Sequence, residues 1–179
     1  KLIYVLFEPS SGQDHIIANE DLLTELRGLH GDLESNHNVV GTDETFPSPS
    51  YEGPYVILRD AILRDSNFGI TYNLEVFQDG GVYVKDYDLP CNLSAAFLSL
   101  STNNSVADAL TGETWSERIK HSVYLKDGNV VNLRNEIRVE AATSAESEQV
   151  VTEFENMLGD VDKSGTLRYN LAGNANLYV

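Results

Sequence analysis

Residues 117–140 read ERIKHSVYLKDGNVVNLRNEIRVE and carry the clearest fold signal in the chain. Apolar and polar residues alternate along two segments on either side of Asp127-Gly128-Asn129, which is the pattern of a half-exposed β-hairpin. A three-residue loop keeps both apolar sets on one face, so we expect a hairpin in that register. The cross-strand pairs that follow are Tyr124–Asn132, Ser122–Arg134 and Lys120–Glu136.

The polar face of this hairpin is locally basic. It holds five of the chain's 12 Lys and Arg residues: Arg118, Lys120, Lys126, Arg134 and Arg138. Cations on this face could meet phosphates, and the ring of Tyr124 could stack on an unpaired base. This face is therefore a candidate for contact with single-stranded RNA. The alternative interpretation is an ordinary solvated sheet face, on which Lys120 and Glu136 form a cross-strand ion pair.

The first 18 residues predict an N-terminal β-hairpin. Leu2–Phe7 (LIYVLF) is a short continuous apolar run, which is typical of a buried strand. A turn signal, Pro9-Ser10-Ser11-Gly12, and a second apolar stretch at residues 15–17 follow it. We therefore expect the two apolar stretches to pair within residues 1–18.

Residues 19–54 predict an insertion ahead of the main sheet. Leucines recur at helical spacing within residues 21–33, and Asn19 is a suitable N-cap for that helix. Three prolines fall within residues 41–54 and indicate a surface loop.

Residues 55–140 predict an antiparallel sheet. We expect one strand over Tyr55–Arg64, and a hairpin whose arms, residues 69–78 and 81–88, flank the turn signal Asp79-Gly80. Its preferred register places Gln78 opposite Val82 and Glu75 opposite Lys85. Residues 89–114 are rich in small and polar residues and are expected to form a long excursion.

Residues 141–179 predict two C-terminal helices. Thr143 and Glu146 form a capping-box pattern ahead of an apolar stripe that ends before Gly159. The tail from Thr166 onward adds one short helix in this interpretation. The whole chain, 1–179, is then a single domain of the α+β class.

This layout predicts a homodimer. One helix of about four turns and a short tail cannot cover the apolar face of a broad antiparallel sheet. The simplest cover for that face is a second copy of the chain.

Composition narrows the classes of function. The chain has 28 acidic and 12 basic residues among 179, and its net charge of −16 disfavours a freely diffusing nucleic-acid binder, because the average field repels phosphates. That charge suits a soluble extracellular, halophilic or assembling protein. No apolar run approaches the roughly 20 residues of a membrane-spanning helix, so no membrane partner is expected. The single cysteine, Cys91, excludes an intrachain disulfide and a cysteine zinc cage.

The predicted order of elements resembles the coat proteins of single-stranded RNA bacteriophages, the leviviruses. The strongest local likeness is residues 135–159, NEIRVEAATSAESEQVVTEFENMLG. In that family the last strand likewise runs through a short Ala/Thr/Ser turn into an acidic-capped helix. The opening LIYVLFEPSSG, the stretch ILRDSNFGITYNLEVF (residues 62–77) and the ending AGNANLYV are also similar.

The resemblance implies a structural protein of the virion. Its intertwined homodimers would tile an icosahedral capsid and bind genomic RNA on the inner face of the sheet. The residues of this chain expected to contact RNA are Arg118, Lys120, Tyr124, Asn132, Arg134, Glu136, Lys85 and Asn73.

Other chemistries have weaker signals. Asp160, Asp162, Ser164 and Gly165 match the start of a calcium-binding loop, but Leu171 stands where its bidentate Glu belongs. A secreted or surface β-rich binding or filament protein, stabilised by calcium, is therefore the alternative function. No catalytic residue, metal site or cofactor is predicted, and we expect the protein not to be an enzyme.

Overall fold

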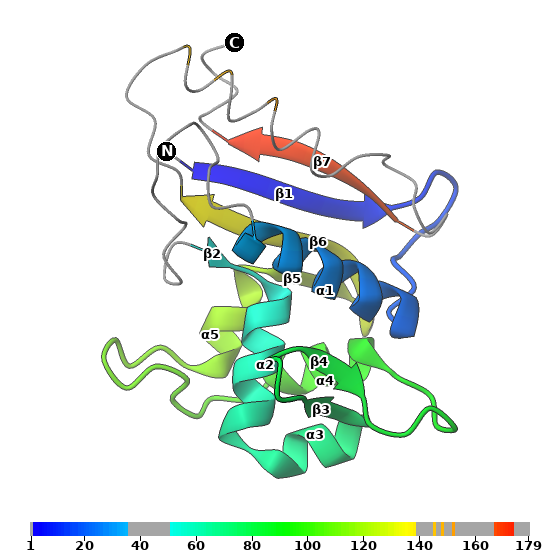
Figure 1. Ribbon diagram of the computed structural model, residues 1–179, viewed down its shortest axis with the longest axis vertical. Coiled ribbons are helices and arrows are strands. Elements are labelled where there is room, and N and C mark those ends of the chain that lie inside the picture. Colours follow the sequence, from blue (N-terminus) through cyan, green and yellow to red (C-terminus); the bar gives the residue numbers. More distant parts are fainter. Residues whose placement is uncertain are drawn as a thin grey trace.

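The computed structural model of the protein describes residues 2–35, 51–138 and 167–173, and the single positions 145, 148 and 152. These parts form a mixed α+β fold. A five-stranded antiparallel sheet packs against helices, and a second, two-stranded sheet lies at the other end of the helical layer (Figure 1).

The first strand of the chain occupies the middle of the main sheet. β1 (Leu2–Pro9) lies between β6 (Asn129–Arg138) and β7 (Leu167–Gly173), and both neighbours are antiparallel to it. β2 (Tyr51–Glu52) and β5 (Val123–Lys126) also pair with β6. The sheet is thus assembled from both ends of the sequence.

Alternation along β1 and β6 gives the sheet one apolar and one mixed face. Val5 and Phe7 are buried, whereas Tyr4, Leu6 and Glu8 are only partly buried on the opposite side. On β6 the buried residues are Val130, Leu133, Asn135 and Ile137.

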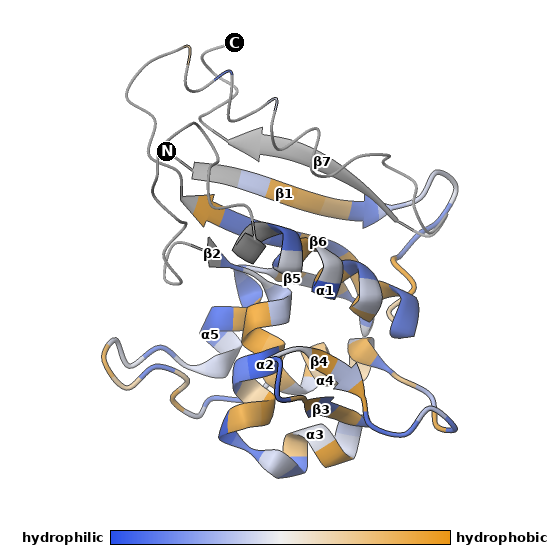
Figure 2. Ribbon diagram, in the orientation of Figure 1, coloured by the Kyte–Doolittle hydropathy of each residue, from blue (hydrophilic) through white to orange (hydrophobic). Residues whose placement is uncertain are grey.

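Two helices cover the apolar face. α1 (Glu20–Ser35) runs across it and contributes the leucines predicted from their spacing, and α2 (Pro54–Arg64) packs beside it (Figure 1). Leu26 of α1 and Leu58 of α2 join the same buried cluster as Val5. Hydrophobic and hydrophilic bands alternate along α2, as expected for a helix with one buried face (Figure 2).

The chain's own helices therefore bury the apolar sheet face, and the inference that a second copy must cover it is wrong. Val5, Leu133 and Ile137 have no exposed surface within one chain. The physical reason lies in Tyr55–Arg64: the predicted strand would enlarge the sheet, but these residues form a helix that covers it.

The second sheet consists of β3 (Leu74–Val76) and β4 (Val82–Val84). Side chains from the helices satisfy both backbone groups of Val82: its N–H donates to the Tyr55 hydroxyl at 2.7 Å, and its carbonyl accepts from Arg27 Nη1 at 2.9 Å. The Arg27 guanidinium also lies 4.3 Å from the ring centroid of Tyr83. These contacts tie the small sheet to α1 and α2.

Three further helices complete the described fold. α3 (Ser66–Tyr72) precedes β3, α4 (Leu93–Ser101) lies in the region expected to be an excursion, and α5 (Trp115–Lys120) precedes β5. α5 replaces the first half of the predicted strand from residue 117, because Thr114 and Glu117 form a complete capping box.

Both ends of the chain differ from the prediction. Residues 10–19 hold no strand, and β1 pairs with β6 and β7 instead of forming a local hairpin. The tail forms the strand β7 rather than a second C-terminal helix. Leu167, Tyr169 and Leu171 alternate with other residues, which is the period of a strand.

The two predicted hairpin cores are confirmed, with changes in detail. Tyr124 does oppose Asn132, and the Arg134 N–H donates to the Ser122 carbonyl at 2.8 Å. The loop is tighter than expected, since Lys126 pairs with Asn129 beside a bulge. In the second sheet Leu74, Val82 and Val84 are buried on one face as predicted, but Val76 rather than Gln78 pairs with Val82 and Glu75 faces Tyr83 rather than Lys85. Residues 69–72 of the predicted first arm belong to α3.

The predicted C-terminal helix is described only at positions 145, 148 and 152, which are helical. The Thr152 hydroxyl donates to the Glu148 carbonyl at 3.0 Å, a bond between adjacent helical turns. The capping box at Thr143, the end at Gly159 and the calcium-loop pattern at 160–165 lie outside the described residues.

Candidate nucleic-acid interface

A pocket of about 410 Å³ opens on the mixed face of the main sheet, on the side away from the α1–α2 layer; we call it the sheet pocket. β1, β5, β6 and the end of α5 supply its walls. The lining residues are Leu6, Glu8, Lys120, His121, Ser122, Val123, Tyr124, Asn132, Leu133 and Arg134. Four of the eight residues expected to contact RNA meet here: Lys120, Tyr124, Asn132 and Arg134.

Arg134 places a cation at the centre of this face. Its guanidinium lies 5.0 Å from the ring centroid of Tyr4, a cation–π distance that orients the side chain. Its Nε atom is buried and has no hydrogen-bond partner among the residues that the structure describes. Arg134 as a whole is only partly buried and lines the pocket, so its guanidinium can meet an anion there.

Tyr124 and Asn132 form an exposed pair across β5 and β6. The Tyr124 side chain is 59% exposed although it sits on a regular strand, so its ring has open access to a ligand. Asn132 is exposed as well, and its amide can both donate and accept hydrogen bonds. Lys120, exposed at the end of α5, adds a second cation at the rim.

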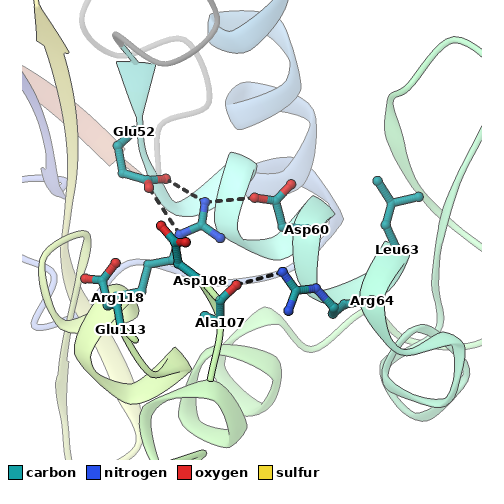
Figure 3. Close-up of a pocket in the computed structure, with 8 residues that line it drawn as sticks. All are labelled: Glu52, Asp60, Leu63, Arg64, Ala107, Asp108, Glu113 and Arg118. Atoms are coloured by element: carbon teal, nitrogen blue, oxygen red, sulfur yellow. Dashed lines mark hydrogen bonds and ion pairs between the residues drawn. The ribbon is translucent and has the colours of Figure 1, made fainter. Parts of the chain in front are cut away.

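Arg118 is not part of this pocket. It belongs to a second cavity of about 500 Å³ between α2, α5 and the preceding loop, which we call the acidic pocket (Figure 3). There it binds Glu52 through Nε at 3.1 Å and Asp60 through Nη2 at 2.8 Å. Burial acts to lower the pKa of Arg118, but the bonds to these two carboxylates outweigh it and raise the pKa above its ordinary value.

Arg64 occupies the same cavity and is also committed to the fold. Its Nη2 donates to the Ala107 carbonyl at 2.8 Å (Figure 3). Its guanidinium lies 5.9 Å from the ring centroid of Trp115. Two carboxylates in the lining, Asp108 and Glu113, leave this cavity with four acids against two guanidiniums. The cavity therefore disfavours phosphate.

Asn73 and Lys85 lie at the second sheet, apart from the sheet pocket. Asn73 ends α3 in a left-handed conformation (φ 59°), which Asn tolerates better than most residues. Its side chain is used locally, because Nδ2 donates to the carbonyls of Asp86 and Leu89 and Oδ1 accepts from the Asp86 N–H. Lys85 follows β4 and is exposed.

Glu136 does share the mixed face with Arg134, as predicted. It pairs with Tyr4 of β1 on one side and with Glu52 of β2 on the other. Lys120, its expected partner, lies on α5 instead.

The sequence prediction missed the contribution of β1 to this site. Leu6 and Glu8 form part of the lining, and Tyr4 supports Arg134. The period of two along β1 places all three residues on one face of the sheet. Their position beside β6 depends on pairing between distant parts of the chain, which local patterns do not indicate.

Metal, thiol and membrane features are limited in the described residues. Across 2–35 and 51–138, no group of three His, Cys, Asp or Glu side chains is arranged to hold a metal ion. Burial, with a smaller contribution from the charge of Glu20, raises the pKa of Cys91 to about 11, so its thiol stays protonated near neutrality. No helix in these ranges has both the length and the apolar character to cross a bilayer.

No family model matches the chain, and neither a curated protein nor a solved structure shows significant similarity to it.

Proposed function

We propose that the protein binds single-stranded RNA through the sheet pocket and serves as a structural subunit of an RNA-phage-type capsid. The observation that carries the RNA proposal is the convergence of Lys120, Arg134, Tyr124 and Asn132 on one pocket. These side chains come from three elements, α5, β5 and β6, and each has a chemistry that suits RNA.

Each of these groups has a role in the proposed contact. Lys120 and Arg134 meet phosphates, the Tyr124 ring stacks on an unpaired base, and the Asn132 amide bonds a base edge or a 2′-hydroxyl. Stacking on one ring contributes about 1–3 kcal/mol per base. Among the described residues of the lining Glu8 is the one carboxylate, so the local charge favours an anion despite the net charge of −16.

The capsid role is supported by the resemblance over residues 135–159. Among the described residues of this region, β6 ends at Arg138 and the single positions 145, 148 and 152 are helical. The described fold departs from the coat-protein layout because residues 10–19 hold no strand and because the last described element is β7. Assembly must also use contacts other than the buried apolar sheet face. In this proposal the protein has no enzyme activity or cofactor and resides in the virion.

Charge removal in the sheet pocket tests the RNA proposal. We expect Lys120→Gln combined with Arg134→Gln to weaken binding to a fluorescent single-stranded RNA. The negative slope of log K against log salt should become shallower by roughly 0.7 for each phosphate that the protein no longer neutralises. Fluorescence anisotropy over a salt series measures both quantities.

The matched control is Lys85→Gln, which removes an exposed cation outside the pocket. It should leave both affinity and salt slope unchanged. A loss of binding free energy from Lys85→Gln that is half the loss of the double variant, the same cost per cation removed, would mean that only overall charge matters, and the sheet pocket would then not be the RNA site.

A further inference from the structure

A pre-ordered loop exposes one leucine almost completely. Residues 105–114, which we call the Leu110 loop, extend away from the body of the fold between α4 and α5 (Figure 1). The Leu110 side chain at its tip is 97% exposed. Among the large hydrophobic residues that the structure describes, Leu110 is the most exposed.

Hydrogen bonds hold this loop in one shape. A β-bridge joins Val106 and Thr114 at its base, and the Ala107 N–H donates to the Glu113 carbonyl at 2.7 Å. At the tip, the Gly112 N–H donates to the Asp108 carbonyl at 2.8 Å, and the Leu110 N–H donates to Asp108 Oδ1 at 2.8 Å. An ordered loop loses little conformational entropy when it docks.

The surroundings of Leu110 are acidic. Asp108 and Glu113 flank it in sequence and line the acidic pocket together with Glu52 and Asp60 (Figure 3). Hydrogen bonds from backbone N–H groups, that of Leu110 first, lower the pKa of Asp108, so this carboxylate stays charged. The loop thus presents an apolar tip with negative charge on both sides.

The sheet pocket has the complementary character. Leu6 is the partly exposed apolar side chain of its lining, Val123 and Leu133 lie in the buried core beneath it, and Lys120 and Arg134 supply positive charge. Its volume of about 410 Å³ is ample for a leucine side chain, since a cavity of roughly 150 Å³ already holds benzene.

We propose that the Leu110 loop of one copy inserts into the sheet pocket of a second copy, with Asp108 and Glu113 facing Lys120 and Arg134. The surfaces involved are different on the two copies, so the contact is heterologous and repeats from copy to copy. Charge complementarity selects a second copy as the partner. The contact goes beyond the proposed RNA binding, with which it competes for one pocket.

Sedimentation velocity at low salt tests this contact. We expect the wild-type chain to associate, and Leu110→Asp to lower the association constant by roughly tenfold or more, as for a central interface residue. Leu89→Asp, at another leucine that is 56% exposed, is the control and should associate like the wild type. A wild-type chain that stays monomeric at its highest soluble concentration would overturn the proposal.

A charge exchange gives a second measurement that does not depend on Leu110. Glu113→Lys and Lys120→Glu should each weaken association, whereas one chain carrying both changes should recover it, because positions 113 and 120 again carry opposite charges. Recovery supports the contact, and a double variant as weak as either single one contradicts it.

A measurement of RNA binding shows whether the self-contact or the proposed RNA binding has failed. Leu110 lies outside the sheet pocket, so Leu110→Asp should leave the affinity for single-stranded RNA unchanged at concentrations where the wild type is monomeric, and should raise the apparent affinity where the wild type associates. If wild-type protein associates through Leu110 but binds no RNA, the RNA proposal fails and the self-contact stands; the converse result rejects the self-contact alone.

Discussion

Tyr55→Phe is expected to lower the free energy of unfolding by about 1–3 kcal/mol, although it removes a single oxygen atom. The Tyr55 side chain has no exposed surface, and its oxygen accepts the N–H of Val82, which is also fully buried. Without that oxygen the Val82 donor stays buried and unpaired, which costs more than the loss of an exposed hydrogen bond. Urea unfolding followed by circular dichroism measures the change.

The matched control is Tyr124→Phe, at a tyrosine whose side chain is 59% exposed. Its stability should equal that of the wild type. If Tyr55→Phe were equally silent, the small sheet could not depend on the Tyr55 hydroxyl.

The same residue predicts a dependence on alkaline pH. Burial raises the pKa of Tyr55 above its ordinary value of 10.0, against the opposing effect of the Val82 N–H. The raised pKa means that stabilisation by neutral Tyr55 is complete below pH 10 and is lost as pH rises through the folded-state pKa. The stability gap between wild type and Tyr55→Phe should therefore stay constant below about pH 10 and narrow as pH rises above it.

Gly69→Ala is expected to destabilise the protein by about 1–3 kcal/mol, which is the usual cost of overpacking. A Cβ atom at Gly69 would lie 2.6 Å from the Leu74 carbonyl oxygen and 3.1 Å from Ile62 Cγ2. The carbonyl belongs to β3 and cannot rotate away like a side chain, so α3 must separate from the small sheet. Thermal unfolding gives a direct reading, since 1 kcal/mol corresponds to about 2–4 °C for a chain of this length.

Gly28→Ala is the control with the opposite sign. Gly28 also lies within a helix, but a Cβ atom there meets nothing within 4 Å. Alanine should stabilise α1 by about 0.5–1 kcal/mol, because it restricts the unfolded chain more than glycine does. A loss of stability at both glycines would point to a general intolerance of substitution rather than to the close approach at Gly69.

Local patterns in the sequence predicted the elements whose partners are nearby. The alternation around Asp127 gave the pairing of Tyr124 with Asn132, and the leucine spacing gave α1. The prediction of a strand over Tyr55–Arg64 was wrong because short apolar runs suit a strand and a buried helix alike. Pro54 at the first helical position was the signal that favoured the helix.

The site was predictable to the extent that it lies on one hairpin. Tyr124, Asn132 and Arg134 share a face because β5 and β6 are adjacent strands, and the period of two is sufficient to place them. Arg118 was misplaced because a helix with a period of 3.6 turns it away from Lys120, toward Glu52 and Asp60. The contribution of β1 required knowledge of long-range pairing.

The central position of β1 has a consequence for how the protein matures. Val5 pairs with Asn135 on one side and with Leu171 on the other, so this apolar strand has no partner in the described sheet until β6 has been synthesised. Contacts between such distant residues make folding slow, and an unpaired apolar strand is prone to aggregate in the meantime. Nascent chains of this protein should therefore rely on chaperones that shield β1 until β6 has been translated.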